Sequence, residues 1–300
     1  ENVKEIFKRV NRPLIDRNIK QAEVPHNCDV LLNTRGTAPG MWFEKEGVIY
    51  ISLPGVPHEM KGLMEQILPR LTKQFLLPAI IHQTVVTSGK GESEVAEHIA
   101  DFENGLPPHI KLAYLPSYGM VKLRLTAKGA DRQKLQKESD HYFNALKEKV
   151  APWLVTDKDQ PMAEVLGDIL KKVKKFVATA ESCTGGYIAH LLTEKAGSST
   201  TFKGGVGGYA NDAKEGSLGV QHQTLVTYGA VSEETVIEMA TGVLSLMKAD
   251  YAVAPSGILG PDGGTKEKPV GTVWIAVADG DEVRTTQYFV RFDRRRNIEQ

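Results

Sequence analysis

Cysteine is scarce in this chain. Only Cys28 and Cys183 occur among its 300 residues, and they lie in different parts of the sequence. Two such distant cysteines do not make the framework of a disulfide-stapled secreted domain. The N-terminus also lacks the short apolar segment of a secretory signal peptide. These absences favour a reducing compartment, and we expect a cytoplasmic protein.

Long apolar runs and an excess of charge of one sign are missing as well. No run approaches the ~18–20 apolar residues that span a bilayer. Lysine plus arginine and aspartate plus glutamate both number 37, so no overall field attracts nucleic acid or an anionic membrane. The eight histidines follow neither H-x-x-x-H nor H-E-x-x-H spacing. We therefore expect no membrane, no nucleic-acid partner and no metal, and we expect His190 and His222 to be bystanders.

The first two parts of the chain show strand and helix patterns. In residues 1–77, Val48–Leu53 predicts a strand, and apolar residues spaced from Met60 to Leu71 predict a helix that Pro69 kinks or ends. Residues 78–155 alternate short strands with helices, including a polar helix at 131–150. The stretch "VTDKDQPMAE" then reads as a linker, with Pro161 near the start of the next helix.

The third part, residues 156–300, has the most regular pattern. It predicts strands at 174–180, 204–210 and 250–257, a hairpin over 271–292 that turns near 279–281, and helices at 185–195 and 232–248. Ser232 suits the N-cap of the second helix. Strands that alternate with helices predict an α/β layer architecture.

A crowded corner joins the first predicted strand of this part to its helix. "ESCTGG" places Ser182, Cys183, Thr184, Gly185 and Gly186 in a row. A hydroxyl beside free N–H groups supplies a nucleophile and an oxyanion hole, which acyl transfer needs. On residue types alone, an ordinary helix N-cap is the alternative. Cys183 is a rival nucleophile, since a thiol at a helix start can be acidic, or else a buried packing residue.

Two later stretches supply groups that could activate such a serine. "GGYANDAKEGSLGV" carries Tyr209 and Lys214, and "SGILGPDGGTKEKPVGTVW" carries Thr265, Lys266 and Lys268. A lysine or tyrosine can act as the base when burial or a nearby cation lowers its pKa. Each of these residues also has a purely structural interpretation. Lys214 could be a solvated helix lysine, Tyr209 a core residue, and Thr265 and Lys268 could shape the entry to a hairpin.

The motifs "AESCTGG", "Y-x-N-x-x-K" and "GPDGGTKEKPVGTVW" together resemble the C-terminal nicotinamide-nucleotide amidohydrolase domain of the CinA family. Upstream, "NTRGTAPGMW" and "LPGVPHEM" are similar to the second half of that family's molybdopterin-binding-like domain. "TSGKGESEVAEHI" and "YLPSYGMVKLRLTAKG" are similar to its KH-type domain. The resemblance implies a partial molybdopterin-binding-like α/β domain at 1–77, a KH-type α+β domain at 78–155 and an α/β/α layered deamidase domain at 156–300.

The resemblance implies hydrolysis of the carboxamide of nicotinamide mononucleotide to nicotinic acid mononucleotide and ammonia, without a cofactor. It implies that Ser182 is the nucleophile and that Lys214 and Tyr209 relay its proton, with the direct base left open. Backbone groups near Thr184–Gly186 would hold the oxyanion, and the loop 262–268 would meet the phosphate. The residues expected to bind the oxyanion or substrate are Cys183, Thr184, Gly185, Gly186, Asn211, Ser256, Gly257, Gly263, Gly264, Thr265 and Lys268.

The chain departs from the family at several points. The T-x-G-G-x-G loop of the N-terminal domain is absent, which puts in doubt the metal-dependent ADP-ribose pyrophosphatase activity that the family associates with that domain. The sequence also stops where the family continues into a final helix. Ala210 replaces a serine, and Leu259 replaces an alanine, where a larger side chain could narrow the pocket loop.

Other hypotheses remain beside the amidase. One is a nucleotide-binding regulatory module without turnover, suggested by Leu259 and the truncated ends. Another is nucleic-acid binding through the KH-like segment, for which a G-x-x-G clamp is lacking. Arg284 and the basic run 291–296 could meet a phosphate, and so could the Gly-rich segment 88–93, although such features are commonly solvated. The resemblance further implies a homodimer.

Overall fold

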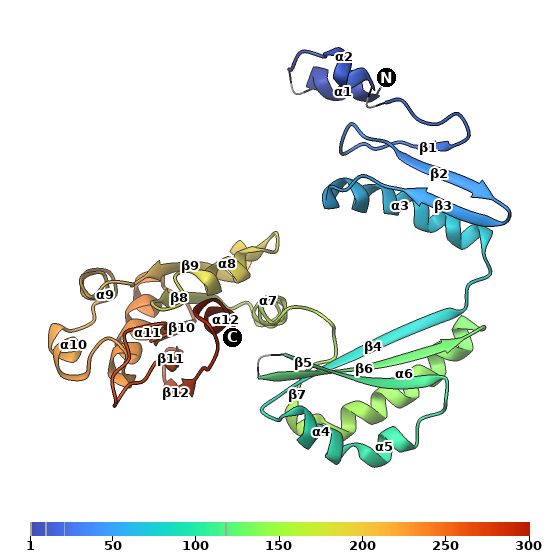
Figure 1. Cartoon of the computed structure of the whole chain (residues 1–300). Coiled ribbons are helices and arrows are strands. Elements are labelled where there is room, and N and C mark those ends of the chain that lie inside the picture. Colours follow the sequence, from blue (N-terminus) through green and yellow to red (C-terminus); the bar gives the residue numbers. More distant parts are fainter. Residues whose placement is uncertain (1, 10, 21, 118) are drawn as a thin grey trace. The chain divides into compact units, whose positions relative to one another are not determined.

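The computed structural model describes the whole chain except residues 1, 10, 21 and 118 (Figure 1). The chain divides into two compact units, residues 1–80 with 128–132 and residues 81–127 with 133–300. Helices and several sheets alternate along it, which confirms the mixed α/β class predicted from the sequence. The three-domain division, with boundaries near residues 77 and 155, stays a prediction.

The first unit contains an antiparallel sheet in the order β1-β2-β3 and a long helix. Its elements are α1 Asn2–Arg9, α2 Asp16–Lys20, β1 Asp29–Leu31, β2 Gly40–Lys45, β3 Val48–Ser52 and α3 Pro57–Gln74. Trp42 of the sheet packs against Leu63 and Ile67 of α3, and Leu71 joins this cluster. The expectation that Pro69 ends the helix is wrong, because α3 continues for one more turn past it and keeps Leu71 against the core.

The middle of the chain forms a four-stranded sheet in the order β5-β6-β4-β7. Its elements are β4 Ala79–Ser88, α4 Glu92–His98, α5 Ala100–Asn104, β5 Ile110–Ser117, β6 Met120–Gly129, α6 Arg132–Lys149, the short 3-10 helix η1 Ala151–Trp153 and β7 Leu154–Thr156. The polar helix predicted at 131–150 is confirmed as α6, which buries only one narrow face. The predicted linker, residues 155–164, is too long at both ends, because Val155 and Thr156 belong to β7 and 162–164 to the next helix. In between, Asp159 pairs with Lys122 and Arg124 of β6.

The C-terminal part of the chain contains a five-stranded mixed sheet, in the order β12-β11-β10-β8-β9. Its elements are α7 Met162–Val173, β8 Val177–Glu181, α8 Tyr187–Thr193, η2 Ser198–Thr200, β9 Phe202–Gly207, α9 Asn211–Leu218, α10 His222–Tyr228, α11 Glu233–Met247, β10 Tyr251–Gly257, β11 Thr272–Ala278, β12 Val283–Phe289 and α12 Arg294–Glu299. Strand β8 runs parallel to β9 and β10, whereas β10, β11 and β12 are antiparallel. The strands, the hairpin and the two helices expected here are confirmed.

Helices cover both faces of this sheet. A Cβ at Gly204 would contact Met247 of α11, while one at the next residue, Gly205, would contact Ala189 of α8. Successive residues of a strand point to opposite faces, so α11 and α8 lie on opposite sides of β9. The layers are therefore α/β/α, as the sequence resemblance implies.

Helix α11 packs closely on the sheet because the strands present small side chains to it. Val236, Met239 and Val243 of α11 lie in one buried cluster with alanines of three central strands, Ala178, Ala180, Ala252, Ala254, Ala276 and Ala278. Ser232 caps the helix, since its side chain accepts a hydrogen bond from the N–H of Thr235 at 3.2 Å. Helix α11 thus packs against the neighbouring strands β8 and β10. The corner described next directly follows β8.

Candidate functional site

The corner after β8 has the sharp geometry that the sequence suggests. Ser182 is 8% exposed, and its N–H donates to the carbonyl of Pro255 on β10 at 3.2 Å. The chain then turns through Gly185 and Gly186, with φ of 62° and 99°. Residues other than glycine rarely adopt such angles, so the two glycines are needed for conformation. The turn brings the chain from the buried strand into α8 within five residues.

Lys214 lies next to this serine. It is 1% exposed on α9, and its Nζ lies 3.1 Å from the Oγ of Ser182. The same Nζ donates to the carbonyl of Gly208 at 2.8 Å and to that of Tyr209 at 3.1 Å. A neutral amine has two N–H groups and one lone pair, so the two carbonyls can take both N–H groups and leave the lone pair for the serine hydroxyl.

Burial lowers the pKa of Lys214 below the ordinary value of 10.5, because the charged form loses its hydration. A lowered pKa increases the fraction of neutral amine near pH 7. The pair therefore has the chemistry of a hydroxyl activated by an amine base.

Cys183 lies in an apolar cluster with Leu259, Val273 and Val290. Burial raises the pKa of its thiol to about 11, so the thiol stays protonated near pH 7. The packing interpretation of Cys183 fits this environment better than the rival nucleophile. Leu259 belongs to the same cluster and is 3% exposed.

Tyr209 takes part in the site through its backbone, while its side chain is 63% exposed. Its hydroxyl accepts a hydrogen bond from Nη2 of Arg294 at 2.9 Å. The structure thus brings Ser182 and Lys214 together and leaves the phenol of Tyr209 paired with an arginine.

The N-terminus of α8 is occupied by a side chain of the protein itself. The N–H of Gly186 donates to the carboxylate of Glu181 at 3.1 Å, and the N–H of Gly185 donates to the carbonyl of Ser182 at 3.1 Å. These two groups are therefore engaged, contrary to the expectation that they hold an oxyanion. Among the described residues, the N–H groups of Cys183 and Thr184 donate to no backbone carbonyl.

The second glycine loop, which follows β10, is closely packed. Ser256 is buried, and its hydroxyl donates to the carbonyl of Ala230 at 2.7 Å. Side chains at Gly257 and Gly264 would collide with β11 and with Val270, and Gly263 has a φ of 95°. Close backbone approach thus accounts for Gly257 and Gly264, and the backbone angle accounts for Gly263.

The polar residues expected to meet the substrate lie on the surface. Thr265 accepts a hydrogen bond from the N–H of Lys268 at 3.0 Å, and Nζ of Lys268 donates to the carbonyl of Tyr228. Asn211 is exposed at the start of α9. Of the other candidates, His222 pairs with Glu215 and Arg284 with Glu282, both on the surface.

Sequence reasoning named Arg294, the first residue of α12, only as part of the basic run 291–296 that could meet a phosphate. Its Nη1 donates to the carbonyl of Gly260 at 2.9 Å, in the second glycine loop, and its Nη2 holds Tyr209. Arg294 thus joins the loop after β9 to the loop after β10. The signal that could have found it is Asp293 before it, an N-cap residue that predicts a helix start within the basic run.

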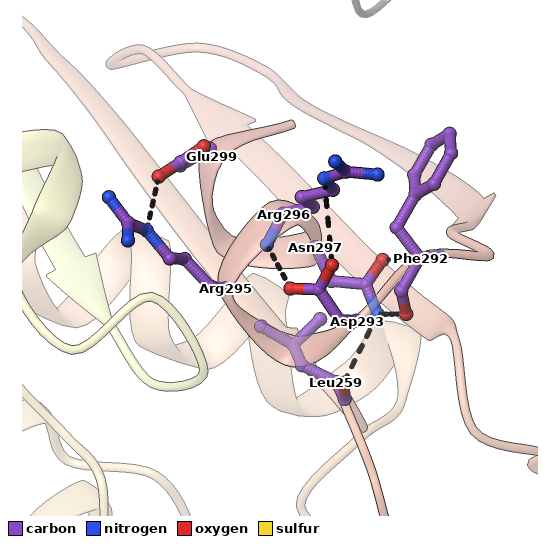
Figure 2. A network of polar contacts seen from close by, with 7 residues as sticks. All are labelled: Leu259, Phe292, Asp293, Arg295, Arg296, Asn297 and Glu299. Carbon is purple, nitrogen blue, oxygen red and sulfur yellow. Dashed lines mark hydrogen bonds and ion pairs between the residues drawn. The ribbon is translucent and has the colours of Figure 1, made fainter.

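A polar network anchors α12 on the second glycine loop (Figure 2). Asn297 is buried, and its amide donates to the carbonyls of Leu259 at 3.1 Å and Phe292 at 2.8 Å. Asp293 caps the helix by accepting from the N–H of Arg296 at 3.1 Å. The second half of the basic run, residues 294–296, therefore lies in an anchored helix that sets the position of Arg294.

Other features lie away from this corner. A cavity of about 180 Å³ lies between α7 and the end of α8, lined by Glu164, Asp168 and Lys195 among others, and it includes neither Ser182 nor Lys214. Over the described part of the chain, no three histidine, cysteine or acidic side chains gather closely enough to hold a metal ion. No helix there has the length and apolar character needed to cross a membrane.

Fold and geometry together define an α/β/α domain with a buried serine–lysine pair at the carboxyl end of β8. The CinA C-terminal domain family matches residues 159–300, and the damage-inducible protein CinA KH domain family matches residues 82–155. A CinA-like protein of Cytophaga hutchinsonii is 49% identical over 282 residues, which are 94% of this chain and 68% of that protein. A CinA-like protein of Flavobacterium psychrophilum is 44% identical over 92% of this chain and 66% of its own length.

A solved structure of the competence/damage inducible protein CihA of Agrobacterium tumefaciens is 43% identical, with a TM-score of 0.44 over 45% of this chain and 84% of that one. The chain belongs to the CinA family. It spans about two thirds of the length of the relatives above.

Proposed function

We propose that this chain hydrolyses the carboxamide of nicotinamide mononucleotide, giving nicotinic acid mononucleotide and ammonia. Family membership supports the substrate, since the sequence motifs resemble the nicotinamide-nucleotide amidohydrolase domain of the CinA family. One observation carries the reaction type: the buried Nζ of Lys214 lies 3.1 Å from the Oγ of Ser182.

In the proposed first step, Oγ of Ser182 forms a bond to the amide carbon while its proton passes to Nζ of Lys214. We assign the direct base to Lys214 rather than Tyr209, because the lysine is within hydrogen-bond distance of the serine and the tyrosine hydroxyl is engaged by Arg294. The proton on Lys214 then goes to the leaving nitrogen, the C–N bond breaks and ammonia departs.

The negative charge on the carbonyl oxygen needs donors that no protein acceptor already uses. The N–H groups of Cys183 and Thr184 donate to no backbone carbonyl among the described residues. An oxyanion-hole donor typically contributes ~10²–10³-fold to the rate. We therefore propose that the backbone N–H groups of Cys183 and Thr184 form the oxyanion hole, in place of those at Thr184–Gly186.

Water completes the proposed cycle. Lys214 takes one proton of the water, whose oxygen bonds to the acyl carbon, and the bond to Ser182 breaks as the serine recovers its proton. One amide and one water thus yield one carboxylic acid and one ammonia. The reaction needs no redox step.

Arg294 provides a cation for the substrate's phosphate. It is the first residue of α12, and its guanidinium forms two contacts with neutral oxygens, those of Gly260 and Tyr209, on the loops after β10 and β9. A phosphate would give it charge-assisted hydrogen bonds, which are stronger than bonds to neutral acceptors. The exposed Thr265 and the half-buried Lys268 lie on the loop after β10 as additional donors.

The test is to incubate the purified chain with nicotinamide mononucleotide and measure both ammonia and the acid product. We expect product from the wild type and from Cys183→Ala, and a loss of at least ~10³-fold in Ser182→Ala. Thermal melting of the three proteins controls for unfolding. A silent wild type that the nucleotide still stabilises would contradict the proposal and favour the binding module without turnover.

A further inference from the structure

We infer that Glu181 is a positioning residue for the proposed reaction: its buried carboxylate holds the Ser182–Gly186 corner in the shape that leaves the N–H groups of Cys183 and Thr184 free for an oxyanion. This inference rests on the proposed function. It concerns a side chain that contacts neither the serine hydroxyl nor Lys214.

The carboxylate of Glu181 is fully engaged. It is 1% exposed and directly precedes the nucleophile. Its Oε2 accepts from the hydroxyl of Thr184 at 2.7 Å and from the N–H groups of Gly186 at 3.1 Å and Ile188 at 2.9 Å. Its Oε1 accepts from the N–H of Ala189 at 2.8 Å.

These four donors explain how a charge can be buried here. An ionised carboxyl out of water is unfavourable unless hydrogen bonds replace its hydration. Three of the donors are backbone groups at the start of α8, where the helix dipole also stabilises negative charge. The backbone of the corner thus stabilises the carboxylate of Glu181, and the carboxylate in turn holds the backbone of the corner in place.

The pattern of donors has a direct consequence for the oxyanion. By engaging the N–H of Gly186 and the hydroxyl of Thr184, Glu181 fixes the turn on both sides of Gly185. The backbone N–H of Thr184 is then fixed as well, without being used.

A glutamine at this position cannot reproduce the network. Its amide keeps one acceptor oxygen, but its NH₂ group would face either the three donors on Oε2 or the N–H of Ala189. We expect the corner to relax while the hydrophobic core of the domain stays intact. The loss should then appear in the chemical step more than in substrate binding.

A matched control exists in the same domain. Glu238 accepts from the N–H of Gln221 at 2.8 Å and from the hydroxyl of Thr224 at 2.7 Å, so it fixes the start of α10 as Glu181 fixes that of α8. Glu238→Gln therefore removes a similar carboxylate–backbone contact outside the corner. Comparing the two variants separates positioning from general stability.

The experiment measures kcat, KM and melting temperature for the wild type, Glu181→Gln and Glu238→Gln, with nicotinamide mononucleotide as substrate. We expect Glu181→Gln to lower kcat by about 10²-fold, the size of a lost oxyanion donor, with KM changed less than about threefold. Glu238→Gln should keep kcat. Equal kcat in the two variants, or an effect confined to KM, would overturn the inference.

Thr184→Val serves if Glu181→Gln does not fold, since it removes only one donor to Glu181 and keeps the N–H of Thr184. We expect a fall in kcat of about tenfold for this variant, and an unchanged kcat would count against positioning.

Hydrogen exchange separates this inference from the proposed function. If the wild type releases no ammonia, the proposed function fails, while exchange of the amides at 183–189 still tests Glu181. We expect faster exchange there in Glu181→Gln than in the wild type or Glu238→Gln. Unchanged protection would show that Glu181 does not hold the corner.

Discussion

Single side chains decide the chemistry of this site, and Lys214 shows how. The buried Nζ has two carbonyl oxygens and one hydroxyl oxygen as neighbours, which are enough acceptors for the three N–H groups of an ammonium. Burial nevertheless removes the hydration of the charged form and lowers the pKa of Lys214, which favours the neutral amine, whose lone pair can take the serine proton. A lysine that looks like any solvated helix lysine in the sequence becomes a base because of where α9 places it.

The lowered pKa of Lys214 should be visible in folding. Below the folded-state pKa the native protein carries a buried charge, and above 10.5 the amine is neutral in both states. Between these limits the unfolded chain binds more protons, so stability rises with pH. We expect the free energy of unfolding of the wild type to rise relative to Lys214→Met over this range, measured by denaturant titration at several pH values. A difference that does not change with pH would contradict the lowered pKa.

Arg294 should affect binding of the phosphate more than the chemical step. We expect Arg294→Gln to raise KM for nicotinamide mononucleotide by about 10–100-fold, the range of a charge-assisted hydrogen bond, with a smaller change in kcat. The matched control is Arg284→Gln, because Arg284 is exposed and paired only with Glu282 among the described residues. Nicotinamide riboside lacks the phosphate, so an equal effect of Arg294→Gln on its hydrolysis would exclude the assigned role.

At the scale of elements, small residues set how closely helices and strands approach the site. Helix α11 crosses the end of α9 at Gly242, where a Cβ would overlap the carbonyl oxygen of Leu218. Leu218 ends the helix that carries Lys214, so this contact fixes the distance between the lysine and the sheet. The packing of α11 thus supports the geometry of the serine–lysine pair.

Gly242→Ala should therefore destabilise the domain. Overpacking of this kind typically costs about 1–3 kcal/mol, and we expect a loss of that size in the free energy of unfolding. Gly216→Ala is the control, since a Cβ there meets no atom within 4 Å and a helical Gly→Ala change stabilises by about 1 kcal/mol. Denaturant titration of the two variants should give shifts of opposite sign, and equal shifts would contradict the close-approach argument.

At the scale of the whole molecule, the proposed chemistry is confined to one part of the chain. Ser182, Lys214 and Arg294 all lie within residues 159–300, the range matched by the CinA C-terminal domain family. Every strand of the five-stranded sheet also lies in this range. The first 155 residues contribute none of the contacts described at the corner.

A chain of residues 156–300 should consequently fold and keep the amidase reaction. We expect its kcat/KM for ammonia release to stay within about threefold of that of the full chain, because a domain with its own core folds alone. The same piece carrying Ser182→Ala serves as the inactive control for ammonia release. A folded but inactive piece would show that the preceding residues contribute to the site.

Local sequence determined much of this protein. Periods of 3.6 and 2 residues placed helix α11, strand β10 and the β11–β12 hairpin, because these patterns depend only on which side chains must face a core. Ser182 and Lys214 could be proposed as partners from the sequence, since their motifs resemble those of the CinA family. The glycines at 185 and 186 pointed to a turn, as only glycine adopts their backbone angles readily.

Tertiary structure alone decided the rest. Arg294 meets Tyr209 across 85 positions of sequence, and no local pattern encodes such a contact. Glu181 gave no signal either, because an acidic residue at the end of a buried strand becomes intelligible only when the following helix turns its N–H groups onto it. Residue types set which hydrogen bonds a side chain can make, whereas the fold determines which donors and acceptors come within reach and which stay free for a substrate.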